Sequence, residues 1–372
     1  MFKRGAGMKK ICLEQSMTSV KRMGRMMFRE NICYLIYSAA QIGFWFDGEE
    51  LGAELVTDDF CQNPAERGVI GVFVGEDKEP WIRFALEKKE DTYELFSRVK
   101  YAKAKGISEN DLPKEVAIRI AKFSEASCGA VGIRYLLTAD KEEIRPLLPK
   151  KRFLEFIGDS ITCGYGVEGV LGRDTFNTMQ ETPFCSYACL CADALEADYE
   201  LVSWSGIGLI SDYCPPERDT PREDILALEN YPYTAMNFCE RNGWEKEMWD
   251  FSGREPDVVV INLGTNDDSY TRGIPERMQR FAESYEKLLS FVREKRPKAQ
   301  IVCCLGVMSR GLLTTLDSLI AKRKEKDDRL HFVELLEQRE EDGIGCDYHP
   351  SARTQAIVAK TLTEAIRGIL RD

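Results

Sequence analysis

The second half of the chain carries the feature that most constrains its fold, a set of five short apolar runs separated by helical patterns. These runs are Phe153–Ile157, Leu201–Trp204, Val258–Leu263, Ile301–Leu305 and Leu330–Leu335. Between the third and fourth runs, Phe281, Tyr285 and Leu288 recur every three or four residues among charges, which is typical of an amphipathic helix. Alternating strands and helices predict a parallel sheet with helices on both faces. Binding sites in such sheets lie at the carboxyl ends of the strands.

The first half follows a different pattern, in which apolar residues alternate with other residues along short segments. Ile42, Phe44 and Phe46 alternate in this way, and several later segments do the same. Short runs of period two, separated by turn residues, predict an antiparallel β-sandwich of about eight strands, of the jelly-roll kind. We therefore expect a loose N-terminal tail over 1–30, a sandwich domain over 31–148 and an α/β domain over 152–372. The joint between the two domains is expected at Pro146–Lys151.

Charge and cysteine content disfavour several functions. The formal net charge is −11, which argues against a nucleic-acid partner because phosphate binding needs clustered Lys and Arg. None of the 13 cysteines forms a C-x-x-C pair, so we predict neither a metal site nor another cofactor. An odd, scattered set of thiols is typical of a reduced cytoplasmic protein. The apolar stretch Ile32–Phe46 lacks a cleavage-site flank and is too short to span a membrane, so we interpret it as a pair of strands.

Ser160 stands directly after the first apolar run, in the segment Phe156-Ile157-Gly158-Asp159-Ser160. A serine at the carboxyl end of a buried strand is placed where a nucleophile would face a substrate. The other interpretation is that Asp159 and Ser160 only cap the next helix, as Asp and Ser often do. The short segment alone does not decide between these interpretations.

Gly206 and Asn266 follow the second and third apolar runs in the same way. The backbone N–H of Gly206 can approach a substrate oxygen because no side chain stands in the way. Asn266 offers an uncharged amide that can donate a hydrogen bond to an oxyanion as it forms. Both segments also have the composition of ordinary turns, so their functional interpretation depends on the other residues.

The chain has two histidines, and one of them lies at the same predicted edge of the sheet. A serine hydroxyl is a poor nucleophile until a base takes its proton, and imidazole is the usual base. His331 lies within the fifth apolar run and is expected to be structural. His349 lies in the loop after that run, and Pro350 suits the first turn of the last helix. Asp347 is close enough in sequence to orient the imidazole, although such a loop could also be a solvated surface segment.

Taken together, these blocks resemble the SGNH (GDSL) hydrolase superfamily, whose members place Ser, Gly, Asn and His in four successive segments. The resemblance covers the whole second domain and implies a flavodoxin-like, three-layer α/β/α fold with a five-stranded parallel sheet. It implies that Ser160 is the nucleophile and His349 its base. It also implies an oxyanion hole made by Ser160, Gly206 and Asn266.

Two longer segments narrow the resemblance. Residues 156–166 and 346–351 are similar to those of the acetylxylan esterases of carbohydrate esterase family two, which also carry a β-sandwich before the hydrolase domain. That family implies removal of acetyl groups from sugar hydroxyls through an acyl-enzyme, without a metal. Many superfamily members have Asp three residues before the His, where this chain has Cys346. In the narrower family a backbone carbonyl can hold the imidazole, so the sequence leaves open whether Asp347 or a carbonyl orients His349.

Aromatic side chains offer candidate contacts with a sugar. Trp244 and Trp249 lie between the second and third runs, and Tyr348 lies beside the predicted base. Aromatic faces stack on sugar rings, but such residues more often pack a loop against its own domain. We expect an acetylated carbohydrate of the xylan or mannan type as substrate, and no pattern indicates an oligomeric state. Two other functions stay open, a lipase, lysophospholipase or thioesterase of the same superfamily and a carbohydrate-binding protein with an inactive second domain.

Overall fold

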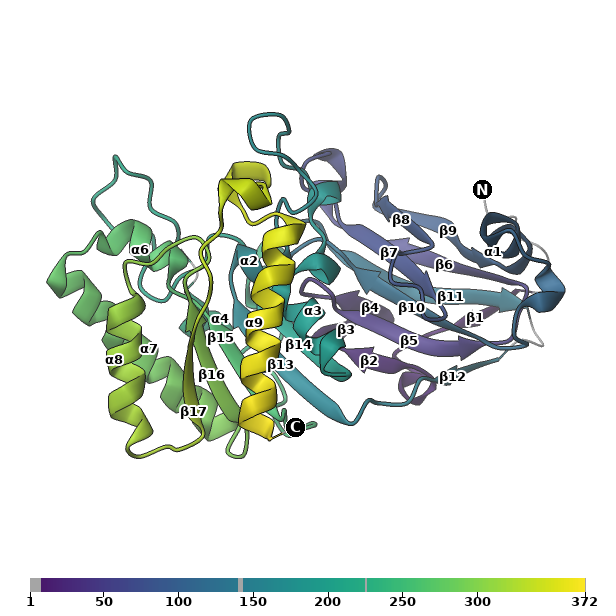
Figure 1. The fold of residues 1–372 in the computed structure, drawn as a ribbon. Coiled ribbons are helices and arrows are strands. Elements are labelled where there is room, and N and C mark those ends of the chain that lie inside the picture. Colours follow the sequence, from purple (N-terminus) through teal and green to yellow (C-terminus); the bar gives the residue numbers. More distant parts are fainter. Residues whose placement is uncertain (1–7, 140–142, 225, 372) are drawn as a thin grey trace. The chain divides into compact units, whose positions relative to one another are not determined.

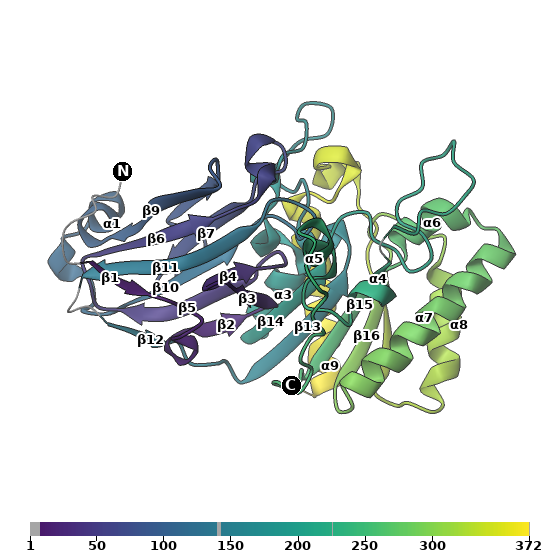
Figure 2. The ribbon, with the colours of Figure 1, turned by 180° about the vertical axis from the view of Figure 1, so that it is seen from behind.

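The computed structural model describes residues 8–139, 143–224 and 226–371. The chain divides into two compact units, Met1–Pro149 and Lys150–Asp372. Figure 1 and Figure 2 show them from opposite sides, the first as a set of long strands and the second as strands covered by helices. None of the described helices combines the length and the apolar character that crossing a membrane requires.

The first unit is a sandwich of two antiparallel sheets with six strands each. One sheet has the order β3-β4-β11-β6-β9 with β1 beside β11, and the other has the order β12-β5-β10-β7-β8 with β2 beside β5. A short helix, α1 (Arg98–Lys105), follows β9. The strands are β1 (Met8–Ile11), β2 (Lys21–Met23), β3 (Met26–Arg29), β4 (Ile32–Leu35), β5 (Gln41–Phe46), β6 (Glu50–Val56), β7 (Val69–Val74), β8 (Ile82–Ala85), β9 (Glu90–Ser97), β10 (Val116–Lys122), β11 (Val131–Ala139) and β12 (Ile144–Pro146).

The alternation seen in the sequence fills the space between the two sheets. Ile42, Phe44 and Phe46 on β5 are fully buried in the core, next to Ile118 and Ile120 on β10. Successive residues of a strand point to opposite faces, so every second residue faces the core. The predicted antiparallel sandwich is therefore confirmed.

Two expectations about the first unit were wrong. Residues 8–30 are not a loose tail, because β1, β2 and β3 all pair with strands of the sandwich; residues 1–7 lie outside the described part. The sandwich has twelve strands rather than about eight, since the added strands are short and some carry little alternation. Asp47-Gly48 connects β5 to β6, which belong to different sheets.

The second unit contains a five-stranded parallel sheet of the order β14-β13-β15-β16-β17. The strands are β13 (Arg152–Gly158), β14 (Ala197–Ser203), β15 (Val258–Asn262), β16 (Gln300–Leu305) and β17 (Leu330–Glu334). Each corresponds to one of the five apolar runs. This strand order is that of the flavodoxin-like sheet, and the predicted fold is confirmed.

Helices cover both faces of the parallel sheet. The connection from β13 to β14 runs in the opposite direction along the sheet from those between β15, β16 and β17, so right-handed crossovers place α3 on one face and α7 and α8 on the other. Figure 1 shows the last helix, α9, beside α3, and Figure 2 shows α7 in front of β16. The helices of this unit are α2 (Ser160–Cys163), α3 (Tyr187–Ala194), α4 (Ala227–Asn230), α5 (Met236–Arg241), α6 (Thr265–Thr271), α7 (Pro275–Lys295), α8 (Leu313–Lys324) and α9 (Ala352–Leu370).

The start of α9 differs from the expectation. Pro350 lies before the helix rather than in its first turn. Ser351 is the capping residue, and its side chain accepts a hydrogen bond from the N–H of Thr354 at 3.2 Å. A serine side chain satisfies the free N–H groups of the first turn, which proline cannot do.

Candidate active site

Three neighbouring strands of the parallel sheet end at the same level. Gly158 at the end of β13 pairs with Ser203 at the end of β14 and with Asn262 at the end of β15. The segments that carry Ser160, Gly206 and Asn266 therefore leave the sheet side by side at its carboxyl edge. This is the edge where parallel sheets place their ligand sites.

Ser160 is the first residue of α2 and follows the capping residue Asp159. The Asp159 side chain caps this helix by accepting the N–H of Ile161 at 3.0 Å. Gly158, the last residue of β13, has to be glycine because a Cβ there would lie 2.0 Å from the side-chain oxygen of Thr162. The capping role that the sequence left as an alternative is thus performed by Asp159, while the Ser160 side chain points elsewhere.

The Ser160 side chain meets His349. The Oγ of Ser160 lies 2.8 Å from Nε2 of His349. The other ring nitrogen, Nδ1, lies 3.2 Å from the carbonyl oxygen of Cys346 and 3.1 Å from that of Asp347. Because carbonyl oxygens only accept, Nδ1 carries the proton and Nε2 is left as the acceptor for the serine hydroxyl. This geometry suits a serine and its general base.

Burial sets the protonation state of His349. Loss of solvent around the ring lowers its pKa from 6.5 to about 4, and the two backbone carbonyls oppose this shift only in part. The imidazole is therefore neutral near pH 7, which is the form that can accept a proton from serine.

The Asp347 carboxylate does not face the imidazole of His349. Its Oδ2 accepts a hydrogen bond from the hydroxyl of Tyr165 at 2.8 Å, and the residue presents its main-chain carbonyl to His349 instead. Asp347 has a left-handed conformation, with φ 51° and ψ 41°, and this conformation directs the carbonyl rather than the carboxylate to the ring. Of the two possibilities left open by the sequence, the geometry favours the backbone carbonyl.

Gly206 and Asn266 are brought together by a hydrogen bond. The Nδ2 of Asn266 donates to the carbonyl of Ile207, next to Gly206, at 2.9 Å. An amide has two N–H groups, so one holds the loop and the other can serve a substrate oxygen. Gly206 has φ +83°, a conformation that favours glycine, and its carbonyl accepts the N–H of Tyr213 at 2.9 Å.

Two buried carboxyl groups, those of Asp159 and Asp267, support these segments; the sequence indicated Asp159 as a possible helix cap, whereas Asp267 was not predicted. Asp267 accepts the N–H groups of Leu209 at 2.8 Å and of Ile210 at 2.7 Å, so it holds the loop after Gly206. Burial raises the pKa of Asp267 to about 6 and that of Asp159 to about 7. The second carboxyl oxygen of each finds no hydrogen-bond partner within the described part of the chain. In the sequence, Asp159 stands directly before Ser160 and Asp267 stands directly after Asn266. These positions were the sequence signal that could have identified the two carboxyl groups.

The aromatic candidates fall into two groups. Tyr348 is 65% exposed beside His349, and Tyr213, which the sequence analysis missed, is 50% exposed beside the Gly206 loop. Trp244 packs edge-on against Phe238, with ring centroids 5.4 Å apart. The main chain of Trp249 bonds within the same segment, to the carbonyl of Pro232. The edge-on contact favours a packing role for the ring of Trp244.

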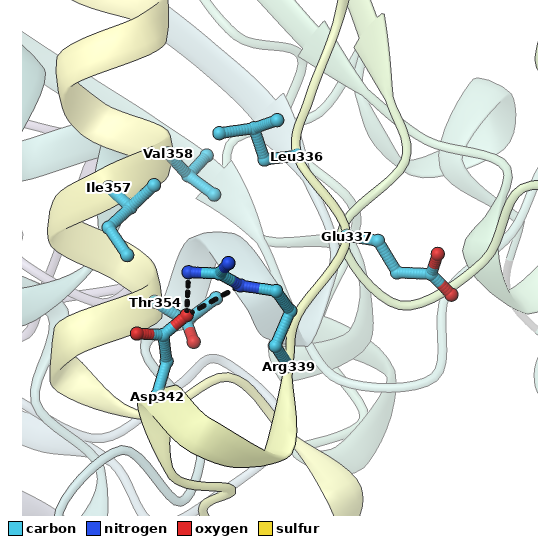
Figure 3. Close-up of a pocket in the computed structure, with 7 residues that line it drawn as sticks. All are labelled: Leu336, Glu337, Arg339, Asp342, Thr354, Ile357 and Val358. Carbon is cyan, nitrogen blue, oxygen red and sulfur yellow. Dashed lines mark hydrogen bonds and ion pairs between the residues drawn. The ribbon is translucent and has the colours of Figure 1, made fainter.

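A small pocket lies beside α9 (Figure 3). It is lined by Leu336, Glu337, Arg339, Asp342, Thr354, Ile357 and Val358. Figure 3 shows the guanidinium of Arg339 on the carboxylate of Asp342, with contacts of 2.9 and 2.7 Å. The carbonyl of Asp342 accepts the Ser351 hydroxyl at 2.7 Å. Neither Ser160 nor His349 lines this pocket, and its polar contacts instead fix the start of α9 beside the His349 loop.

Comparison with known proteins identifies a matching family and several related proteins. The model of the GDSL-like Lipase/Acylhydrolase family matches residues 156–357. The Cellulase/esterase CelE of Acetivibrio thermocellus is 37% identical over 67% of this chain, and the chain spans 29% of that protein. An acetylxylan esterase / glucomannan deacetylase of Cellvibrio japonicus is 30% identical over 68% of this chain and 69% of that protein.

A solved structure resembles the chain over almost its whole length. A family two carbohydrate esterase from Clostridium thermocellum, in complex with cellohexaose, has a TM-score of 0.78 and 29% identity. The match covers 95% of this chain and 99% of that chain. The chain therefore belongs to the GDSL-like lipase/acylhydrolase family.

Proposed function

We propose that the protein is a serine esterase that removes acetyl groups from acetylated sugars through an acyl-enzyme. The observation that carries this proposal is the 2.8 Å contact between Ser160 Oγ and His349 Nε2 at the carboxyl edge of the sheet. The related proteins are named as a cellulase/esterase, an acetylxylan esterase / glucomannan deacetylase and a carbohydrate esterase, which supports the sugar acetate as substrate.

The first step is acylation of the serine. His349 takes the proton of Ser160 as its Oγ attacks the acetyl carbonyl carbon. The negative oxygen of the tetrahedral intermediate is held by the backbone N–H groups of Ser160 and Gly206 and by the Asn266 amide. The imidazolium then gives its proton to the sugar oxygen, the ester bond breaks, and the sugar leaves as an alcohol.

The second step releases acetate. His349 takes a proton from a water molecule, which attacks the acyl carbon attached to Ser160. The collapsing intermediate expels the serine oxygen, which regains its proton from His349. Throughout the cycle, the two carbonyls on Nδ1 stabilise the imidazolium in place of a carboxylate.

The exposed tyrosines are the proposed sugar contacts. Tyr348 and Tyr213 place apolar ring surface beside the base and beside the oxyanion loop. We expect Tyr348→Ala to raise KM for an acetylated xylo-oligosaccharide and to leave KM for p-nitrophenyl acetate unchanged, because the small ester has no sugar ring to stack. Equal effects on both substrates would remove Tyr348 from sugar recognition.

The cytoplasm is the proposed location. None of the 13 cysteines, all of which lie within the described residues, forms a disulfide, and 12 of them are buried. Burial raises the pKa of Cys189 and Cys303 to about 12, so these thiols stay protonated and unreactive. A cytoplasmic enzyme would act on imported acetylated oligosaccharides. Fractionation of cells tests this, and acetyl esterase activity outside the cytoplasmic fraction would contradict it.

A series of acyl chains tests the proposed acyl specificity. The rate of hydrolysis of p-nitrophenyl esters should fall sharply when the acyl chain exceeds two to four carbons, and the Ser160→Ala variant should hydrolyse none of them. A preference for long acyl chains would assign the same Ser160 and His349 to a lipase or thioesterase.

A further inference from the structure

Tyr165 connects the two residues of the proposed catalytic pair. Its backbone N–H donates to the carbonyl of Ser160 at 3.1 Å. Its ring lies against the imidazole of His349, with centroids 4.3 Å apart and a tilt of 40°. Its hydroxyl donates to the Asp347 carboxylate at 2.8 Å. One residue thus contacts the serine turn, the base and the segment that orients the base.

The surroundings of Tyr165 leave its ring little freedom. The face away from the imidazole stacks on Phe176, with centroids 3.7 Å apart and an interplanar angle of 11°. The next residue, Gly166, accepts the N–H of Cys346 at 3.1 Å. Gly166 has φ +61°, and a Cβ on it would lie 2.8 Å from the Cys346 side chain. The serine segment and the histidine segment therefore pack together directly.

The segment before His349 has a strained backbone that needs such support. Asp347 and Tyr348 have φ values of 51° and 62°, and consecutive non-glycine residues rarely share this left-handed region. The conformation at Asp347 turns its carbonyl onto Nδ1 of His349. A side-chain amide, Nε2 of Gln338, holds the carbonyl of Tyr348 at 2.7 Å, and the Tyr165 hydroxyl holds the carboxylate of Asp347.

We propose that Tyr165 and Asp347 are positioning residues, in which the tyrosine hydroxyl fixes the Asp347 carboxylate so that the main chain keeps His349 aimed at Ser160. The inference rests on the proposed function, because it concerns the same serine and base. It assigns the carboxylate the role of a hydrogen-bond acceptor for Tyr165. A triad carboxylate, by contrast, acts through its negative charge on the imidazolium.

This difference predicts an unusual set of mutant activities. Tyr165→Phe keeps the ring but loses the hydroxyl, so kcat for p-nitrophenyl acetate should fall by about ten- to a hundredfold with KM unchanged, since small misplacement of a base is costly. Asp347→Asn keeps an acceptor oxygen for Tyr165 and tolerates the left-handed backbone, so its kcat should fall much less than that of Asp347→Ala. For a charged triad member, the same change typically costs about ten-thousandfold.

The decisive experiment is a double-mutant cycle with two readouts. Steady-state kcat and the rate at which a fluorophosphonate labels Ser160 are measured for Tyr165→Phe, Asp347→Ala and the combination. If the two residues act through one hydrogen bond, the double variant loses no more than the worse single variant. Multiplied losses, or a fully active Tyr165→Phe, would overturn the inference, as would an Asp347→Asn variant as slow as Ser160→Ala.

Two controls separate this inference from the proposed function. Tyr93→Phe removes another tyrosine hydroxyl while keeping a ring stacked on Phe84, and it should have normal kcat and normal labelling. Ser160→Ala should abolish both readouts. If Ser160→Ala kept its activity, the proposed function would fail, whereas an inactive Ser160→Ala with a normal Tyr165→Phe would reject only the positioning role. Circular dichroism of each variant confirms that it is folded.

Discussion

The Oγ of Ser160 lies 2.8 Å from Nε2 of His349, although the two residues are 189 positions apart in the chain. The parallel sheet makes this possible, because β13 leads to the serine and the loop after β17 leads to the histidine at one edge. The opposite nitrogen of the imidazole faces the carbonyls of Cys346 and Asp347. The protein thus places a serine beside a histidine base, and main-chain carbonyls hold the imidazole where a triad would use a carboxylate.

The pH dependence of the reaction should reflect this environment. Because burial lowers the pKa of His349 to about 4, the neutral base persists well below pH 6.5. We predict that kcat/KM for an acetyl ester is constant between about pH 5 and pH 7 and falls as the pH drops through about 4. Tryptophan fluorescence in the same buffers serves as the control for unfolding. An acid limb centred near pH 6.5 would contradict the assigned environment of His349.

Replacement of Asn266 tests the oxyanion hole. Asn266→Ala should stay folded and lose about a hundred- to a thousandfold in kcat, the usual cost of one oxyanion donor. Asn242→Ala is a matched control, since its amide also donates to a backbone carbonyl, that of Phe238 at 2.8 Å, but in a different segment. Near-normal turnover by Asn266→Ala would remove this residue from the mechanism.

The buried carboxyl of Asp159 should make stability depend on pH. Burial raises its pKa to about 7, so the folded protein keeps the proton while the unfolded chain releases it near pH 4. Stability from this group is therefore present at low pH and is lost as the pH rises toward 7. Asparagine cannot ionise but can still cap α2, so the Tm of Asp159→Asn relative to the native protein should increase between about pH 4 and pH 8. A Tm difference independent of pH would show that Asp159 ionises normally.

The buried ion pair between Glu155 on β13 and Arg296 predicts an effect on stability. Glu155 is fully buried and receives the Nε of Arg296 and the hydroxyl of Tyr231, both at 2.8 Å. Arg296→Met removes the guanidinium from a buried carboxylate and should lower the free energy of unfolding by about 3–5 kcal/mol. Chemical denaturation measures this change. Arg145→Met is the control, because its pair with Glu115 is exposed and its loss should have no measurable effect. A loss as small as that of the control would contradict the buried pairing.

The fold of the second unit could be predicted from sequence because each buried parallel strand is a continuous apolar run. The strands β13 to β17 lie within a few residues of those runs. The strands of the sandwich were harder to predict. Strands such as β2 (Lys21–Met23) and β12 (Ile144–Pro146) are three residues long and too short to show the alternation of apolar and polar residues. Their pairing with β5 depends on contacts between distant segments, which a local pattern does not contain.

The candidate site was likewise predictable from the sequence only in part. The blocks around Ser160 and His349 could be located because each follows a strand at the same edge. The orientation of the imidazole could not, since it depends on the φ and ψ of Asp347 and on a tyrosine hydroxyl 182 positions away. Tyr165 lies within residues 156–166, which resemble the esterase family, but its contact with Asp347 forms only in the folded chain and could not be predicted.

Acetate release from acetylated xylo- and manno-oligosaccharides tests the account most directly. The native protein should release acetate with multiple turnovers, and Ser160→Ala should lose at least about a thousandfold in rate, because the proposed mechanism requires the serine to form the acyl-enzyme. Acetate release by Ser160→Ala at the native rate, or none by the native protein from any acetylated sugar, would contradict the account.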